Sequence, residues 1–199
     1  MVVPETLPDP IAVAVSFTNA LERLDVPYLI GGSFASSVHG EPRSTNDIDI
    51  VADLREEHVT RFVELVRGEY YVSEEAVREA IRLGGSFNVL HMGAAVKIDV
   101  FIAGDDPFNR ERLQSRARVL VASSPQTYMF LDTAEHSILR KLEWYRRGGE
   151  VSDRQWRDVL AILRVQGSRL DQSRLHSWAD RLGVSDLLGR ALEDAKLED

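Results

Sequence analysis

Patterns typical of β-strands stop at about residue 130 of this 199-residue chain, and helical spacing of apolar residues continues from there to the end. We therefore expect an α/β (α+β) arrangement, with a mixed sheet of about four or five strands and helices on it in residues 1–130. Residues 131–199 should form a helical C-terminal subdomain. The expected strands are the short apolar or alternating runs at residues 26–30, 47–51, 86–91, 95–102 and 118–122.

Helical segments are expected between these strands. Residues 11–24 and 56–66 have apolar residues at helical spacing. Residues 33–39 are mostly small and follow a glycine pair, which favours a short helix. Ser73 can cap a further helix that extends to about residue 83. The strands at 86–91 and 95–102 should form a hairpin.

Two helix starts are predicted in the second part of the chain. Asp132 with Glu135, and Ser152 with Gln155, have the spacing of capping boxes. The short link at residues 147–150 predicts that the two helices it joins are antiparallel and packed together.

Composition is that of a globular protein, with 44% hydrophobic and 28% charged residues. There is no cysteine, so the chain has no disulfide and no thiolate metal site, and a reducing compartment is the natural expectation. The first ten residues lack the features of a secretory leader, and no apolar run approaches the roughly 18 residues of a membrane span. We expect a cytoplasmic protein with no membrane partner.

The net charge of −8 disfavours broad, nonspecific binding to nucleic-acid phosphates. Arginines cluster at residues 110–118 and 140–157. These clusters are either docking points for a charged partner or solvated helix faces, and the sequence leaves both readings open.

Three aspartates are the candidate catalytic residues. Asp47 and Asp49 are two residues apart in an expected strand, so their carboxylates lie on one face about 6.6 Å apart while Ile48 faces the core. Asp99 has the same relation to its apolar neighbours in a later strand. If the two strands are adjacent, the carboxylates converge and need cations to offset their repulsion. Hard oxygen ligands suit Mg²⁺, and a pair of ions, Mg²⁺ or Mn²⁺, would bind there.

Other readings of these aspartates are a solvated strand end or a calcium loop. A calcium-binding EF-hand loop that starts at Asp47 would need an oxygen ligand at position 51 and a glycine at position 52. The chain has Val51 and Ala52 there, which argues against calcium.

A glycine turn precedes the aspartates. Gly32 and Ser33 come directly before the expected helix at 33–39, where free backbone N–H groups and the helix dipole favour an anionic phosphate. Arg43 or Thr45 could bind substrate or orient the loop that leads to Asp47. A second run, residues 84–86, leads into a strand and is interpreted as a turn.

This constellation resembles the DNA polymerase β-like nucleotidyltransferase superfamily. The family motif is a hydrophobic residue and Gly-(Gly/Ser), then about nine to thirteen residues, then Asp-hydrophobic-(Asp/Glu)-hydrophobic, with a third carboxylate later. Residues 28–103 follow it in order, with thirteen residues between Ser33 and Asp47. The resemblance implies a Mg²⁺-dependent nucleotidyltransferase fold and enzyme, with Asp47, Asp49 and Asp99 as metal ligands.

The helical part resembles bacterial abortive-infection-type (AbiEii-like) nucleotidyltransferases, which carry a Lys in one helix and an Arg-Asp pair in the next. Lys141 and Arg157-Asp158 match these positions. The resemblance implies that Lys141 contacts the triphosphate and that Asp158 positions the lysine or the acceptor. The alternatives are that Lys141 extends along its own helix and that Asp158 pairs with Arg154.

The tryptophans on helical patterns, Trp144, Trp156 and Trp178, are expected to be packing residues rather than platforms for a base.

The implied reaction is transfer of a nucleoside monophosphate from an NTP to an acceptor, with release of pyrophosphate. Members of the superfamily modify tRNA, proteins or small molecules, and some act as toxins or antitoxins with a genetic partner or in phage defence. The alternative is a catalytically silent protein that binds a nucleotide or a partner chain, as an antitoxin does. The sequence does not identify the acceptor.

Overall fold

The computed structural model describes residues 9–45, 47–94 and 96–196. The first eight residues, used above to argue against a secretory leader, and Ala95, the expected start of a strand, lie outside the described part. Among the helices that are described, none is long and apolar enough to cross a membrane.

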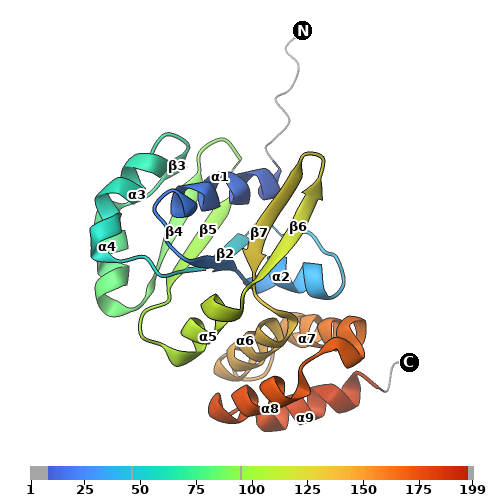
Figure 1. The fold of residues 1–199 in the computed structure, drawn as a ribbon. Helices are drawn as coiled ribbons and strands as arrows, with labels where there is room; N and C mark the ends of the chain where they lie inside the picture. Colours follow the sequence, from blue (N-terminus) through green and yellow to red (C-terminus); the bar gives the residue numbers. More distant parts are fainter. Residues whose placement is uncertain (1–8, 46, 95, 197–199) are drawn as a thin grey trace.

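The described strands form one mixed, seven-stranded sheet in the order β3-β4-β5-β2-β1-β7-β6 (Figure 1). The pairs β2–β5 and β1–β7 are parallel, and the other neighbours are antiparallel. The strands are β1 (Tyr28–Ile30), β2 (Asp47–Ala52), β3 (Tyr70–Tyr71), β4 (Ser86–His91), β5 (Lys97–Ile102), β6 (Ala117–Ser123) and β7 (Gln126–Leu131).

Helices α1, α3 and α4 cover one face of the sheet and form the main core with it. Phe17 of α1 and Phe62 of α3 meet edge to face in this core, beneath the inward-facing Ile48 and Ile98. Because side chains alternate along a strand, the residues next to Ile48 in β2 and next to Ile98 in β5 face the opposite side of the sheet. The three helices span Pro10–Glu22, Val59–Val66 and Glu74–Leu83.

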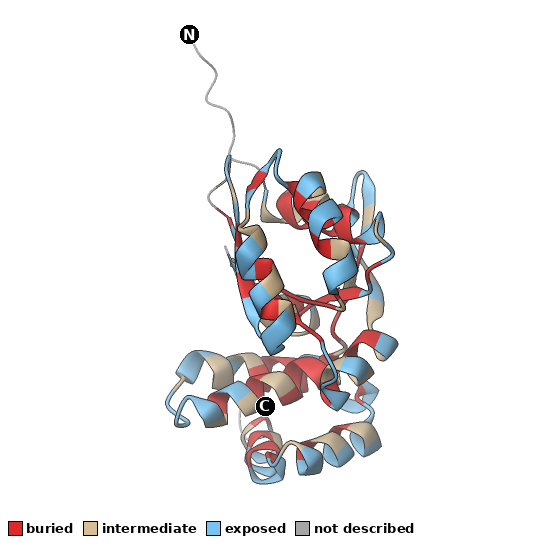
Figure 2. Ribbon diagram, turned by 90° about the vertical axis from the view of Figure 1, so that its left-hand side faces the viewer, coloured by how far each residue is buried: buried red, intermediate tan, exposed pale blue. Residues whose placement is uncertain are grey.

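Helices α6 to α9 pack together into a second core at the other side of the sheet (Figures 1 and 2). Phe108 of α5 belongs to this core, so the helical part reaches back before β6. The division into domains at residue 131 therefore stays a prediction. The remaining helices are α2 (Gly32–His39), α5 (Pro107–Ser115), α6 (Ala134–Arg147), α7 (Asp153–Gln166), α8 (Gln172–Arg181) and α9 (Ser185–Asp194).

The predicted fold class is confirmed, and so is the β4–β5 hairpin. The sheet is larger than expected because β3 and β7 were not predicted. β3 has only two residues, and β7 mixes polar and aromatic residues without clear alternation. Helix α5 was also missed, since Phe108 and Leu113 are its only buried apolar residues.

The prediction that Asp132 caps α6 is wrong. Thr133 is the N-cap and accepts a hydrogen bond from the His136 N–H. Asp132 is fully buried and instead forms a bidentate ion pair with Arg112 of α5, with distances of 2.9 Å to Nε and 2.6 Å to Nη2. The pair ties α5 to the junction of β7 and α6.

The second predicted cap is present in part. Ser152 caps α7 by accepting a hydrogen bond from the Gln155 N–H. The Gln155 side chain does not complete a box, because its Oε1 accepts from Lys141 Nζ at 3.3 Å.

We expect Asp132→Asn to lower the free energy of unfolding by about 3–5 kcal/mol, because it leaves the buried Arg112 guanidinium without a counter-charge. Urea unfolding followed by circular dichroism measures the loss. The control is Asp186→Asn, which breaks an exposed pair with Arg146 and should change stability far less. Equal losses in the two variants would contradict this role of Asp132.

Candidate active site

The register of two parallel strands brings two of the predicted carboxylates together. Asp49 of β2 is paired with Asp99 of β5, and Asp47 is paired with Lys97. Asp49 and Asp99 are half-buried on the sheet face opposite the main core, whereas Asp47 is exposed at the start of β2. Asp49 and Asp99 are thus neighbours, with Asp47 farther out.

A lysine lies among these acids. Lys97 Nζ is 2.8 Å from Asp99 Oδ2. The hydrogen bond to Asp99 is the main cause of the raised pKa of Lys97, and the negative charges of Asp47 and Asp49 raise this pKa further. In the ranges the structure describes, no group of three or more acidic, histidine or cysteine side chains is placed to hold a metal ion. The metal-binding role of the three aspartates therefore stays a prediction.

The electrostatics of Asp49 nevertheless suit a bound cation. Burial raises the pKa of Asp49, and the nearby charge of Asp99 raises it further, while Lys141 opposes both. A desolvated carboxylate beside a second carboxylate is stabilised by a cation. Mg²⁺ is commonly held by only one or two protein carboxylates, so the Asp49–Asp99 pair has the donor chemistry for it.

The glycine turn lies directly against Asp49. Gly32, the first residue of α2, has φ of +55°, and a Cβ at this position would be 1.7 Å from Asp49 Oδ2. The Gly31 N–H also donates to the Asp49 carbonyl at 2.9 Å. Only glycine can therefore connect β1 to α2 while the carboxylate occupies this place.

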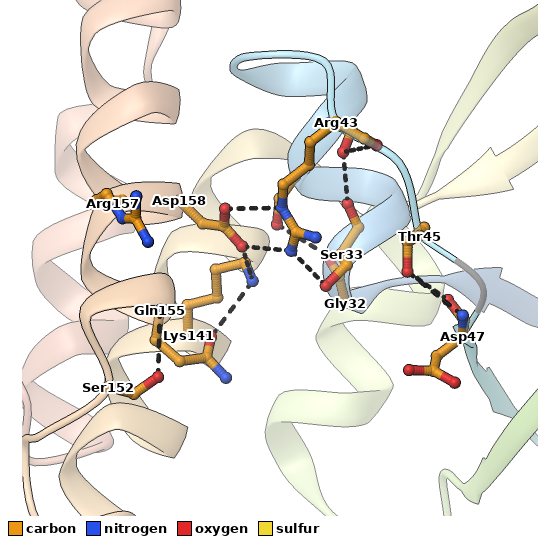
Figure 3. A network of polar contacts seen from close by, with 12 residues as sticks. Gly32, Ser33, Arg43, Thr45, Asp47, Lys141, Ser152, Gln155, Arg157 and Asp158 are labelled. Carbon is orange, nitrogen blue, oxygen red and sulfur yellow. Dashed lines mark hydrogen bonds and ion pairs between the residues drawn. The ribbon is translucent and has the colours of Figure 1, made fainter.

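A polar network connects α2 to the helical part (Figure 3). Arg43 donates to Ser33 Oγ at 2.5 Å and to both carboxylate oxygens of Asp158, at 3.1 and 2.8 Å. Lys141 Nζ lies 2.7 Å from Asp158 Oδ2. Asp158 is therefore the shared counter-ion of two cations that come from different elements.

Burial and pairing act in opposite directions in this network. Burial lowers the pKa of Lys141, and the hydrogen bond from Lys141 to Asp158 offsets only part of this decrease. Burial would raise the pKa of Asp158, but its hydrogen bonds from Arg43 and Lys141 outweigh that effect and leave it lowered. Lys141 thus reaches across to α7 rather than along its own helix, and Asp158 pairs with Arg43 and Lys141. The substrate contacts predicted for these residues stay predictions.

Thr45 acts on the backbone of the candidate site. Its hydroxyl donates to the Asp47 carbonyl at 3.0 Å and lies 3.4 Å from the Asp47 N–H. Thr45 therefore contacts the backbone at the start of β2, and the roles predicted for it, substrate binding or orientation of the loop, stay predictions. Arg157 is turned away from the network and contacts the Asp153 carbonyl.

A cavity of about 620 Å³ begins at the glycine turn and runs over the open face of the sheet toward α5 and α6. Its lining includes Asp49 and Lys141 together with residues that the sequence did not single out for function. They include Gly84, Gly85, Ser86, Asn109, Ser137 and Trp144, and the lining also holds Arg112 and Arg140, one from each of the two arginine clusters noted in the sequence.

Some of these residues had a signal in the sequence. Residues 84–86 form the predicted turn, with Gly84 in the left-handed C-cap of α4. Trp144 is 45% exposed and lines the cavity, so the packing role predicted for it is wrong, whereas Trp156 and Trp178 do pack against the helical core. Ser137 had no signal beyond helical spacing, and Arg140 had only its place in the arginine cluster at residues 140–157.

Solved structures with the same fold are nucleotidyltransferase-like proteins. An antigenic nucleotidyltransferase-like protein from Paracoccidioides brasiliensis matches 93% of this chain and 93% of its own, with 20% identity and a TM-score of 0.54. The antibiotic-resistance factor ANT(2'')-Ia, in a complex with adenylyl-2''-tobramycin, matches over 86% of this chain and 97% of its own, with 13% identity and a TM-score of 0.54. No family model matches the sequence, and no curated protein does. At these identities the comparisons establish the fold, which is that of nucleotidyltransferases.

Gly32→Ala tests the contact with Asp49, and Gly84→Ala is its matched control. Both glycines have positive φ, but a Cβ at Gly84 meets nothing within 4 Å. Gly84→Ala should cost about 1–2 kcal/mol for the left-handed conformation alone. Gly32→Ala should cost clearly more, because its Cβ must also displace the Asp49 carboxylate. Urea unfolding of both variants measures the difference, and equal costs would contradict the contact.

Asp49→Asn should stabilise the protein in a way that depends on pH when divalent ions are chelated. A raised pKa in the folded state means that wild-type stability falls as the pH rises from the ordinary aspartate pKa, about 3.9, through the raised value. The variant lacks this loss, so its advantage should grow across that window and then stay constant. Urea unfolding between pH 4 and pH 8 measures it. A stability difference between the variant and wild type that does not depend on pH would show that the pKa of Asp49 is not raised in the folded protein.

Proposed function

We propose that this chain is a Mg²⁺-dependent nucleotidyltransferase that moves a nucleoside monophosphate from an NTP to an acceptor. The observation that carries the proposal is the placement of Asp49 beside Asp99, directly against the backbone of the Gly31–Gly32 turn. A carboxylate pair at a glycine-rich helix start combines a site for a hard cation with a site for phosphate.

The phosphate-binding residues surround this point. The N–H groups at the start of α2, with the Ser33 hydroxyl, hold the triphosphate. Lys141 and Arg43 supply positive charge beside them, and Asp158 orients both side chains. Because each cation shares one counter-ion, part of its charge remains available to an anionic substrate.

In the reaction, an acceptor oxygen attacks the α-phosphorus, and the bond between that phosphorus and the oxygen bridging to the β-phosphate breaks. Pyrophosphate leaves with the electron pair of that bond, and the acceptor proton passes to the Asp99 carboxylate. Asp49 and Asp99, with Asp47 as the third predicted ligand, would hold divalent ions, Mg²⁺ or Mn²⁺, which would neutralise the charge on the attacking and leaving oxygens.

The acceptor is a small molecule, a protein or an RNA such as tRNA. The structural similarity to a protein solved with adenylyl-2''-tobramycin supports a small molecule. The net charge of −8 argues against a large RNA surface. A role as toxin or antitoxin beside a partner chain rests on the resemblance of the helical part alone.

The test is thermal unfolding of wild type, Asp49→Ala and the control Asp53→Asn with Mg²⁺ and each NTP. An NTP at 100 times its dissociation constant should stabilise wild type by about 2.7 kcal/mol. The Asp49 variant should lose this protection, and the Asp53 variant, altered at an aspartate that pairs with Arg55 away from the cavity, should keep it. Protection that survives Asp49→Ala would place the nucleotide elsewhere.

Incubation with labelled NTPs and cell extract separates enzyme from binding protein. Transfer of label to RNA, protein or metabolites by wild type, and not by Asp99→Asn, is the expected result. Protection without any transfer would favour the catalytically silent alternative.

A further inference from the structure

Two residues that line the cavity each carry a buried polar atom with no hydrogen-bond partner among the described residues: Ser137 Oγ and Arg140 Nε. Ser137 is 4% exposed, so the solvent does not satisfy its hydroxyl. Buried polar groups in folded proteins are nearly always paired, and an exception in a cavity wall points to a ligand that supplies the partner.

Arg140 is held in place by its other nitrogens. Nη1 contacts Glu143 at 2.5 Å, Nη2 donates to Asn109 at 2.7 Å, and the guanidinium lies 4.9 Å from the centre of the Phe108 ring. Its orientation is therefore fixed before any ligand binds, with only Nε unused.

Both unpartnered atoms can donate a hydrogen bond: Arg140 Nε is a donor only, and the Ser137 hydroxyl can donate as well as accept. Two carboxylates of the lining are engaged, since Asp132 pairs with Arg112 and Asp106 caps α5, and a third, Asp49, belongs to the proposed metal site. A ligand group that presents hydrogen-bond acceptors would satisfy both atoms. Val51 and Phe101 add apolar surface to the lining, which suits the face of a ring.

The cavity is continuous with the proposed phosphate site. Ser137 and Lys141 are four residues apart and so lie on one face of α6, and Lys141, Gly32 and Ser33 line the same cavity. Asp99 does not line it, so the cavity extends from the triphosphate away from the carboxylate assigned to the acceptor. A volume of about 620 Å³ suits a small ligand.

We propose that this cavity seats the nucleoside of the NTP, and that Ser137 and Arg140 select the base by donating hydrogen bonds to acceptor atoms on its edge. The proposal rests on the proposed function and adds the residues that discriminate among NTPs. Trp144, at the rim, covers the outer side of the nucleoside.

The test compares calorimetric binding of the four NTPs with that of inorganic tripolyphosphate, which lacks a nucleoside, in the presence of Mg²⁺. The variants are Ser137→Ala and Arg140→Lys. The control is Ser115→Ala, which removes a helical hydroxyl outside the cavity. Thermal unfolding confirms that each variant folds.

Each cavity variant should raise the dissociation constant of the preferred NTP about threefold to tenfold, the loss of one hydrogen bond, and should narrow the differences among NTPs. Tripolyphosphate binding, and all binding by the control, should stay unchanged. Unchanged NTP affinities, or equal weakening of NTP and tripolyphosphate, would overturn the inference. If wild type binds neither NTP nor tripolyphosphate, the proposed function itself fails and this inference falls with it.

Discussion

The parallel pairing of β2 with β5 is the constraint on which the candidate site depends. It sets Asp49 beside Asp99 on the sheet face that the main core leaves open. A shift of one residue in this register would turn these side chains into the core and its isoleucines outward, so the burial of Ile48 and Ile98 maintains the pairing. The same apolar packing that folds the sheet therefore also places the carboxylates.

The second determinant is charge sharing between the sheet side and the helical part. Asp158 on α7 holds Lys141 from α6 and Arg43 from the loop after α2, and it keeps both cations near the glycine turn. The two cationic partners compensate for the desolvation of this carboxylate, whereas a desolvated carboxylate without a partner would destabilise the fold. Under the proposed function, substrate phosphate would enter a region in which the cations are already oriented, which would lower the entropic cost of binding.

The sequence predicted the features that depend on local spacing. The alternation of Asp47, Ile48 and Asp49 indicated the strand and its polar face, and Gly32 before small residues indicated the turn. It did not predict what depends on tertiary packing. Asp132 has the spacing of a cap, but burial beside Arg112 decided its role. The unpaired hydroxyl of Ser137 follows from the packing of α6 against the rest of the cavity wall, which no local pattern encodes.

One face of α6 carries Ser137, Lys141 and Trp144, spaced by about one turn each, and all three line the cavity. A single inserted residue within this helix would rotate the positions beyond it by about 100° and separate them from those before it. Substitutions at individual positions carry no such penalty. Under the proposed function, new substrate preferences would therefore be accessible by exchanging side chains along α6 at constant helix length, while the aspartates on the strands stay where they are.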